Sequence, residues 1–338
     1  MPIRVAINGF GRIGRGTFKA AFGKVKSIEF VAINDLTDTR TLAHLLKYDT
    51  AYGTYDRKVS FDDDHLIVDG KKVRVYAERD PSQLPWKKHR IDVVLECTGR
   101  FRTEELAGQH LTAGAQRVII SAPAKGGDVP TFVIGVNAEK GVGRPKIINN
   151  ASCTTNCIAP VAAIMHGKFG VRRAIMTTVH GYTADQNLQD GPHKDLRRAR
   201  AAAMNMIPTT TGAAIATTET IPDLKGLFDG LAIRVPIPVT SLADFTFLLK
   251  KKTTVEEINR TFRQAAKNPI FKGVLAVSDE PLVSSDYVGC PYSSVVDLGL
   301  TKVIGGDFVK VVAWYDNEWG YSLRLAEMAE RVGKSLEK

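Results

Sequence analysis

Cys153 is the residue of this sequence with the clearest capacity for chemistry. It lies in the segment ASCTTNCIAP, after a polar stretch and at the predicted start of an apolar helix. The N-terminus of a helix stabilises a thiolate, which is the reactive form of cysteine. The neighbouring side chains of Ser152, Thr154 and Thr155 are small and can form hydrogen bonds. We therefore predict that Cys153 is a nucleophile.

A nucleophilic thiol usually needs a nearby base, and His180 is the best candidate among the seven histidines. It ends the apolar strand pattern AIMTTVH beside a glycine, at the kind of sheet edge where active sites gather. Sequence spacing alone does not pair His180 with Cys153. Cys153 and Cys157 form a C-x-x-x-C, but no second cysteine or histidine pair follows at ligand spacing, so we expect no metal.

A second chemical feature is the glycine-rich segment GFGRIG over residues 9–14. It follows a predicted strand, opens a predicted helix, and precedes a second strand that leads to Asp35. In that context the glycines let the backbone approach a pyrophosphate, and the helix N-terminus offers it N–H groups. Asp35 can accept hydrogen bonds from both ribose hydroxyls and would repel a 2′-phosphate, so we expect NAD rather than NADP. The alternative is a glycine turn that only packs a helix against a strand.

The elements that must position this loop are those of a doubly wound α/β domain. Near-continuous apolar runs alternate with helix-like stretches, which is typical of a parallel sheet covered on both faces. We predict a Rossmann-type dinucleotide-binding domain over residues 1–151. Its expected elements are a helix over 12–23 and strands over 3–8, 28–34, 73–77, 91–97, 118–121 and 132–136.

The second half of the chain has a different pattern, which predicts an α+β catalytic domain with a mostly antiparallel sheet over residues 152–317. The polar stretch 184–200 has little periodicity, and a stretch that long without structure of its own is usually a functional loop. The last segment, 318–338, has helical spacing and is expected to pack back on the first domain. The other expected elements are a helix over 153–166, strands over 174–179, 231–235, 245–249, 274–278 and 294–300, and a hairpin over 302–316 turning at Gly305-Gly306.

Composition excludes several classes of protein. The 338 residues are 44% apolar, and no apolar run approaches the roughly 18 residues of a membrane span, so we expect no membrane association. Four cysteines are too few for a disulfide framework, which favours a reducing, cytoplasmic setting. The net charge of +10 is compatible with nucleic acid, an anionic surface, small anionic ligands, or solubility alone.

Six segments carry a resemblance to the phosphorylating glyceraldehyde-3-phosphate dehydrogenases. INGFGRIGR, ASCTTNC, TTVHGYT, PHKDLRRARAAA, IPTTTGAA and WYDNEWGYS occur in an order and at spacings similar to that family, over essentially the whole chain. The resemblance implies that Cys153 attacks the aldehyde carbon and forms a thiohemiacetal. It implies that His180 activates the thiol and takes the proton as hydride leaves to the nicotinamide. Inorganic phosphate would then cut the thioester to give an acyl phosphate.

The resemblance also implies binding residues and an assembly. Thr183 and Arg234 would hold the phosphate group of the substrate, glyceraldehyde 3-phosphate. The residues around the attacking inorganic phosphate would be Ser152, Thr154, Arg198, Thr211 and Gly212. The cofactor would contact Arg12, Ile13, Asp35, Arg79, Ser121 and Asn317, with Asn317 orienting the carboxamide. A homotetramer is implied, with the loop over residues 184–200 near a neighbour's cofactor.

The sequence departs from the family pattern at three places, and it leaves two other functions open. Ile215 stands where a lysine is usual, Leu323 where an asparagine is usual, and Gly191-Pro192 where NAD-preferring members often have Leu-Pro. The missing leucine leaves room for a 2′-phosphate, so NADP use stays open. An erythrose-4-phosphate dehydrogenase would share the Cys-His chemistry. A non-catalytic protein that binds RNA through its dinucleotide domain would instead present a continuous basic face; we expect no obligatory nucleic acid.

Overall fold

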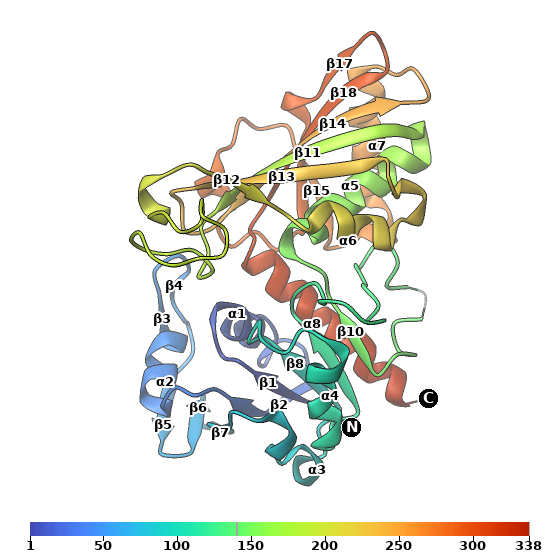
Figure 1. Cartoon of the computed structure of the whole chain (residues 1–338). Helices are drawn as coiled ribbons and strands as arrows, with labels where there is room; N and C mark the ends of the chain where they lie inside the picture. Colours follow the sequence, from blue (N-terminus) through green and yellow to red (C-terminus); the bar gives the residue numbers. More distant parts are fainter. Residues whose placement is uncertain (140, 338) are drawn as a thin grey trace. The chain divides into compact units, whose positions relative to one another are not determined.

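The computed structural model describes residues 1–139 and 141–337 (Figure 1). The chain divides into two compact units. The first contains residues 1–132, 141–151 and the C-terminal segment from 322. The second contains residues 133–139 and 152–321.

The first unit is built on an eight-stranded sheet in the order β10-β9-β8-β1-β2-β7-β6-β5. The six strands from β10 to β7 are parallel, and β6 and β5 extend the sheet antiparallel. Because β1 pairs with both β2 and β8, the carboxyl ends of these three strands meet where a doubly wound sheet binds ligands. The strands are β1 (Ile3–Asn8), β2 (Ile28–Asn34), β5 (Val59–Asp62), β6 (His65–Val68), β7 (Lys71–Tyr76), β8 (Val93–Glu96), β9 (Arg117–Ile120) and β10 (Ile147–Asn149).

Helices and a small hairpin complete this unit. They are α1 (Arg12–Ala21), α2 (Thr39–Lys47), α3 (Trp86–His89), α4 (Glu104–Thr112) and the hairpin β3 (Tyr48–Asp49) with β4 (Gly53–Thr54). The C-terminal helix α8 (Trp319–Lys334) contributes its residues from 322 onward. There, Ser27 Oγ donates to Glu330 Oε1 at 2.5 Å, and Gly333 lies against Ile3, where a side chain would have no room.

The strand predicted over residues 132–136 is wrong. This segment is a turn in which the carbonyl of Val133 accepts the N–H groups of Val136, Asn137 and Ala138. The side-chain oxygen of Asn137 accepts the N–H of Val133 at 2.8 Å, and Gly135 has a φ of +84°. The run is apolar because Phe132, Val133 and Ile134 are buried, and burial by itself does not distinguish a strand from a packed turn.

The second unit is built on a mixed sheet in the order β12-β13-β11-β14-β18-β16-β15, with β17 paired to β18. Only the pairs β11–β13 and β15–β16 are parallel, as expected for a mostly antiparallel sheet. The predicted hairpin is present, turning at Gly305-Gly306. The strands are β11 (Val171–Gly181), β12 (Ile207–Thr210), β13 (Phe228–Val235), β14 (Ser241–Leu249), β15 (Leu275–Ser278), β16 (Ser294–Asp297), β17 (Lys302–Ile304) and β18 (Phe308–Tyr315).

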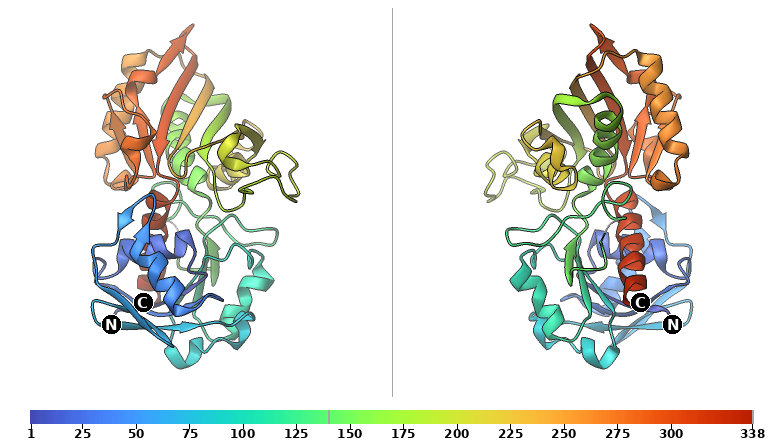
Figure 2. Two further views of the ribbon diagram at one scale, coloured as in Figure 1. Left: turned by 90° about the vertical axis from the view of Figure 1, so that its left-hand side faces the viewer. Right: turned by 90° about the vertical axis from the view of Figure 1, so that its right-hand side faces the viewer.

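Helices α5 (Cys153–Phe169), α6 (Ala213–Thr220) and α7 (Val255–Lys267) pack on this sheet. Their contact surface is a continuous apolar core that includes Met165, Phe247 and Phe262. Residues 184–200 contain neither helix nor strand, as predicted, and extend away from the strands of this unit (Figure 2, yellow-green). No helix in the described part of the chain is long and apolar enough to cross a membrane.

Candidate active site

Cys153 is the first residue of α5, as the sequence predicts. Ser152 caps this helix, because its Oγ accepts the N–H of Thr155 at 3.0 Å. The Cys153 sulfur lies 4.0 Å from Thr154 Oγ1, and the residue is partly exposed. The helix start therefore presents a thiol that a small substrate can reach.

His180 faces this thiol from the carboxyl end of β11, with Nε2 3.5 Å from Cys153 Sγ. The other ring nitrogen, Nδ1, lies 2.6 Å from the carbonyl oxygen of Gly181. Arg234 Nη1, which can only donate, lies farther from Nδ1, at 3.2 Å. Because the carbonyl contact is the shorter one and a carbonyl only accepts hydrogen bonds, we place the proton on Nδ1, and Nε2 presents its lone pair to the sulfur. The structure thus pairs two residues that sequence spacing could not pair.

Burial favours the neutral form of both groups before reaction, and the guanidinium of Arg234 adds to this effect only at His180. Burial, reinforced by the positive charge of Arg234, lowers the pKa of His180 to about 3. Burial raises the pKa of the Cys153 thiol, and Arg234 opposes that effect only in part. A neutral imidazole beside a neutral thiol is suited to accept the thiol proton as the sulfur reacts.

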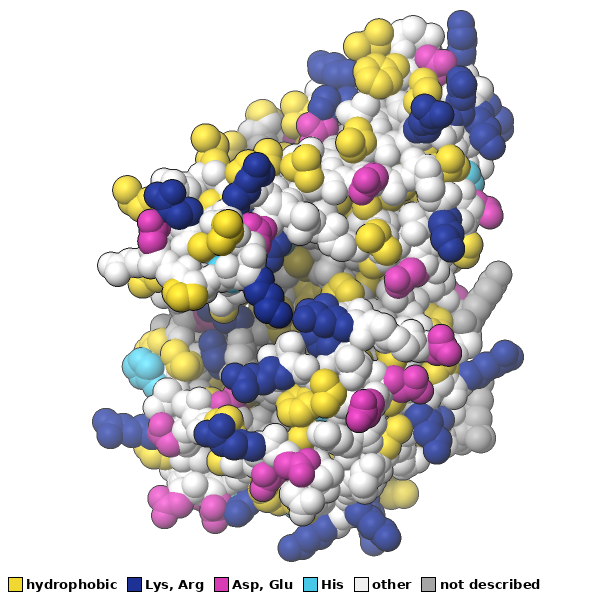
Figure 3. Space-filling view, viewed as in Figure 1, with side chains coloured by type: hydrophobic (Ala, Val, Ile, Leu, Met, Phe, Trp, Pro, Cys, Tyr) yellow, Lys and Arg dark blue, Asp and Glu magenta, His cyan; other side chains and the backbone are white. Residues whose placement is uncertain are grey.

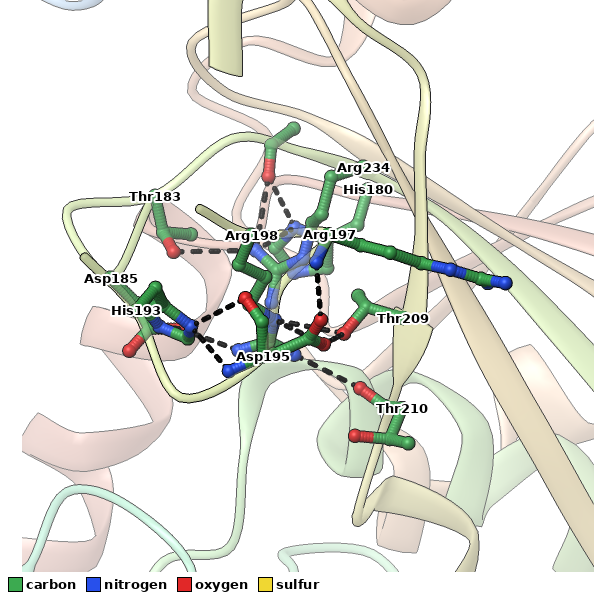
Figure 4. Close-up of polar contacts among 11 residues, drawn as sticks. His180, Thr183, Asp185, His193, Asp195, Arg197, Arg198, Thr209, Thr210 and Arg234 are labelled. Carbon is green, nitrogen blue, oxygen red and sulfur yellow. Dashed lines mark hydrogen bonds and ion pairs between the residues drawn. The ribbon is translucent and has the colours of Figure 1, made fainter. Parts of the chain in front are cut away.

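Arg234 and Thr183 lie together beside His180 (Figure 4). β13 pairs with β11 so that Arg234 is opposite His180. The Nη1 group of Arg234 donates to Thr183 Oγ1 and to the Gly181 carbonyl, both at 3.3 Å. Burial lowers the pKa of Arg234, but an arginine keeps its charge. A guanidinium next to a hydroxyl can bind a phosphate group.

Arg198 is held by a set of polar contacts that the sequence did not reveal (Figure 4). Its Nε donates to Thr209 Oγ1 at 2.9 Å and its Nη1 to Asp185 at 2.5 Å. Thr209 in turn donates to Asp195 Oδ2 at 2.5 Å. The two carboxylates and Thr209 come from the polar loop and the next strand, so only folding shows that they hold one arginine.

Two further predicted phosphate residues lie at the start of α6. Gly212 is the residue before the helix, and Thr211 Oγ1 accepts the N–H of Ala213 at 3.2 Å. The first N–H groups of a helix favour a bound anion.

Tyr315 is a residue of this site that the sequence prediction missed. Its hydroxyl lies 3.0 Å from Thr154 Oγ1 and 2.8 Å from Thr178 Oγ1. Its ring packs edge-on against His180, with the ring centroids 6.0 Å apart. Burial raises the pKa of the Tyr315 hydroxyl, which therefore stays protonated. The WYDNEWGYS segment contains this residue, but its sequence does not show that the hydroxyl turns inward.

A pocket in the first unit opens at the carboxyl ends of β1, β2 and β8. Asp35 and Arg79 line it, together with Gly9 and Thr98. Gly9 has a φ of +90°, and a Cβ there would lie 2.7 Å from the Thr98 nitrogen, so only glycine fits. Asp35 accepts the backbone N–H groups of Phe10 and Thr37, at 2.8 and 3.0 Å, one on each carboxylate oxygen. This glycine turn and fixed carboxylate fit a dinucleotide.

The other four predicted cofactor residues are not among the described residues that line this pocket; they are Arg12, Ile13, Ser121 and Asn317. Arg12 and Ile13 begin α1, where the Arg12 guanidinium pairs with Asp49 at 3.2 Å. Ser121 follows β9, and its N–H donates to the Glu96 carbonyl. Asn317 belongs to the second unit and accepts a hydrogen bond from Ser241 Oγ at 3.0 Å.

A buried polar cluster fixes the end of β8 beneath the pocket. Glu96 Oε2 accepts from Asn8 Nδ2 at 2.5 Å and lies 3.1 Å from His110 Nε2. Trp86 Nε1 donates to the other ring nitrogen of His110 at 3.0 Å, so the proton of the neutral ring is on Nε2, facing Glu96. The second oxygen of Glu96 accepts both the N–H and the hydroxyl of Thr98. The position of Thr98 in the pocket wall thus depends on a buried carboxylate.

Comparisons with known proteins match regions of both units. Residues 152–317 match the family model described as glyceraldehyde 3-phosphate dehydrogenase, C-terminal domain. Residues 3–104 match the model of the NAD binding domain of the same family. The chain belongs to the glyceraldehyde-3-phosphate dehydrogenase family.

Individual members of the glyceraldehyde-3-phosphate dehydrogenase family are similar over nearly the full length. The enzyme named glyceraldehyde-3-phosphate dehydrogenase from Geobacillus stearothermophilus is 54% identical over 335 residues, 98% of both chains. Its namesake from Mycolicibacterium smegmatis is 53% identical over 343 residues, 99% of this chain and 100% of the relative. The chloroplastic A form from Chlamydomonas reinhardtii is 52% identical over 334 residues, 98% of this chain and 89% of the relative.

Membership of the glyceraldehyde-3-phosphate dehydrogenase family confirms several predictions. The chain has the Rossmann-type and catalytic domains of the family, is an NAD-dependent oxidoreductase, and takes NAD as its cofactor. Ile215, which stands where the family usually has a lysine, is 66% exposed on α6. The isoleucine therefore replaces a surface charge and its side chain is not part of the core. Among the described residues, no group of three or more His, Cys, Asp or Glu side chains could hold a metal ion.

Proposed function

We propose that this chain converts glyceraldehyde 3-phosphate, inorganic phosphate and NAD to 1,3-bisphosphoglycerate and NADH through a covalent intermediate on Cys153. The observation that carries the assignment of residues is the 3.5 Å contact between Cys153 Sγ and the unprotonated Nε2 of His180. It lies within the residues that match the family's C-terminal domain.

Cys153 and His180 begin the reaction. The thiol proton moves from Sγ to His180 Nε2 as the sulfur bonds to the aldehyde carbon. The aldehyde oxygen takes that proton back from the imidazolium, which gives a neutral thiohemiacetal. The backbone N–H of Cys153 and the imidazolium stabilise the developing oxyanion. The low pKa of His180 favours return of the proton, so the base is ready for the next step.

His180 then accepts the hydroxyl proton of the thiohemiacetal as its carbon is oxidised to a thioester. NAD supplies the hydride acceptor for this oxidation. An oxygen of inorganic phosphate attacks the thioester carbonyl carbon and forms a C–O bond. The C–S bond then breaks, which releases the acyl phosphate from Cys153. The Cys153 thiolate recovers its proton from His180, and the proton of the phosphate goes to solvent. The thioester conserves the energy of oxidation that direct attack by water would lose.

Two anion sites would hold the two phosphates. We assign the phosphate of the substrate to Thr183 and Arg234, which are 3.3 Å apart beside the base. We assign inorganic phosphate to a set that combines one guanidinium, three hydroxyls and the start of α6. Its members are Ser152, Thr154, Arg198, Thr211 and Gly212. Guanidinium groups surrounded by hydroxyl donors are suited to binding phosphate dianions.

We assign cofactor binding to Arg12, Ile13, Asp35, Arg79, Ser121 and Asn317. The pocket position of Asp35 and Arg79 supports the first unit as the nucleotide domain. We also propose domain limits of 1–151 and 152–317, with the C-terminal helix joining the first domain. The division of the chain at residues 151 and 152 supports these limits.

We further propose a homotetramer in the cytoplasm. Leu188, Leu196, Met204 and Met206 are each more than three-quarters exposed on or next to the loop over residues 184–200. Exposed apolar side chains gathered on one segment favour contact with another subunit. All four cysteines are free thiols, which suits a reducing compartment. Sedimentation equilibrium would test the assembly, and a single species of monomer mass would contradict it.

The decisive assay compares two sugars. Phosphate-dependent NADH formation should be much faster with glyceraldehyde 3-phosphate than with erythrose 4-phosphate, and equal or faster turnover of the latter would reverse the assignment. A non-catalytic RNA-binding protein would show strong, salt-sensitive RNA binding and a thiol inert to iodoacetate. On the face drawn in Figure 3, Lys and Arg side chains are interspersed with acidic and apolar ones rather than continuous, which favours the enzyme.

A further inference from the structure

Ser241 joins two segments of the second unit that the proposed reaction uses. It is the first residue of β14 and is 2% exposed. In the sheet it is paired with His180 on β11 and with Tyr315 on β18. Its hydroxyl lies 3.3 Å from the Gly181 nitrogen and 3.0 Å from Asn317 Oδ1. Ser241 therefore bridges the strand end that holds the base and the residue assigned to the nicotinamide.

The direction of these hydrogen bonds follows from the chemistry of a hydroxyl group. Gly181 N–H can only donate, and it is shared between Ser241 Oγ and the Thr240 carbonyl at 3.2 Å. A serine hydroxyl has one proton, so that proton goes to Asn317 Oδ1. With its oxygen committed in this way, Asn317 offers its Nδ2 group as the donor for any ligand.

The backbone around Ser241 is held in place on both sides. Thr240 has a φ of +74°, a conformation that a β-branched residue rarely adopts. The carbonyl of Gly181, whose N–H reaches Ser241, accepts the Nδ1 proton of His180 at 2.6 Å. A continuous set of hydrogen bonds thus leads from His180 through Gly181 and Ser241 to Asn317.

We propose that Ser241 is a positioning residue that orients the Asn317 amide. It holds the nitrogen of Asn317 toward the carboxamide oxygen of the nicotinamide, and it ties that amide to the same strand end that fixes the tautomer of His180. This inference rests on the proposed function, in which Asn317 orients the carboxamide. Ser241 itself does not touch the reacting atoms.

Binding of two ligands to the full-length protein tests this role without turnover. Titration calorimetry would measure the dissociation constants of NAD and of ADP-ribose, which lacks the nicotinamide. We expect Ser241→Ala to raise the dissociation constant of NAD about fivefold, as the loss of one positioning hydrogen bond would, and to leave that of ADP-ribose unchanged. Equal weakening of both ligands, or no change for NAD, would overturn the proposal.

A double-mutant cycle checks that Ser241 acts through Asn317. In an Asn317→Ala background, Ser241→Ala should have no further effect on NAD affinity. Independent, multiplying effects would overturn the proposal. Ser241→Cys keeps the volume of the side chain with a far weaker hydrogen-bonding group, so it should reproduce the pattern of Ser241→Ala even if that variant folds poorly. Unchanged NAD affinity in Ser241→Cys would contradict the role.

Two controls separate this inference from other effects. Ser294→Ala removes a hydroxyl that is also fully buried in the same sheet, and it should change neither dissociation constant. Ser241→Thr retains the hydroxyl and should bind NAD more tightly than Ser241→Ala does. Failure of the proposed function would show as a wild-type protein without phosphate-dependent NADH formation. Failure of the inference leaves wild-type turnover intact and is visible only in the two ligand affinities.

Discussion

The sulfur of Cys153 lies 3.5 Å from Nε2 of His180, and the opposite ring nitrogen is committed to the Gly181 carbonyl. Cys153 lies at the start of α5, and His180 lies near the end of β11. This arrangement leaves the base unprotonated on the side that faces the thiol. The chemistry proposed for the enzyme depends on that one contact more than on any other.

Replacement of Cys153 by serine should nearly abolish turnover. A serine hydroxyl is a much weaker nucleophile than a thiol beside the same base, so we expect kcat to fall by about 10⁴-fold or more. NAD affinity, measured by calorimetry, should stay within about twofold of wild type. Substantial residual turnover would contradict the assignment of the nucleophile.

Replacement of Arg234 by glutamine should make the Cys153 thiol harder to ionise. The charge of Arg234 lowers the pKa of Cys153 against the opposing effect of burial. Its removal should therefore raise that pKa further. The pH dependence of Cys153 alkylation by iodoacetamide, followed by mass spectrometry without substrate, should shift to higher pH.

Arg172→Gln is the matched control for that experiment. Arg172 is exposed at the opposite end of β11 from His180, so its loss removes the same charge away from the thiol. Its alkylation curve should superimpose on that of wild type. Equal curves for Arg234→Gln and wild type would show that the guanidinium does not act on the thiol.

Replacement of His110 by alanine should destabilise the nucleotide-binding unit. The Glu96 carboxylate and the Trp86 N–H would each lose a buried partner, which costs about 3 kcal/mol or more of unfolding free energy. Urea unfolding would measure this loss. The exposed His44 on α2 provides the control, since His44→Ala should change stability by less than about 0.5 kcal/mol.

Replacement of Asp35 by asparagine should relax the preference for NAD. The charge that would repel a 2′-phosphate is removed while the side chain keeps its size, so the ratio of kcat/KM for NADP to that for NAD should rise about fivefold or more. Asp63→Asn removes an equivalent charge from an exposed turn and should leave the ratio unchanged. If Asp35→Asn also leaves it unchanged, another residue makes the discrimination.

Local patterns were enough to predict much of this protein. The glycine turn at residues 9–14 and the carboxylate of Asp35 follow from spacing, because a strand, a tight turn and a helix must succeed one another within a short segment. The position of Cys153 at a helix start follows for the same reason. The error at residues 132–136 shows the limit of such patterns, since an apolar run reports burial and not the hydrogen bonds that the backbone makes.

The residue types and their local order indicate the chemical groups present: a thiol, an imidazole, several arginines and a dinucleotide turn. Which of these groups meet depends on the fold. His180 is 27 residues from Cys153, and the links from Ser241 to Gly181 and Asn317 span 60 and 76 residues. Burial by the surrounding parts of the chain also raises the pKa of the Cys153 thiol. Contact and desolvation both depend on what other parts of the chain pack around a group, which no local pattern specifies.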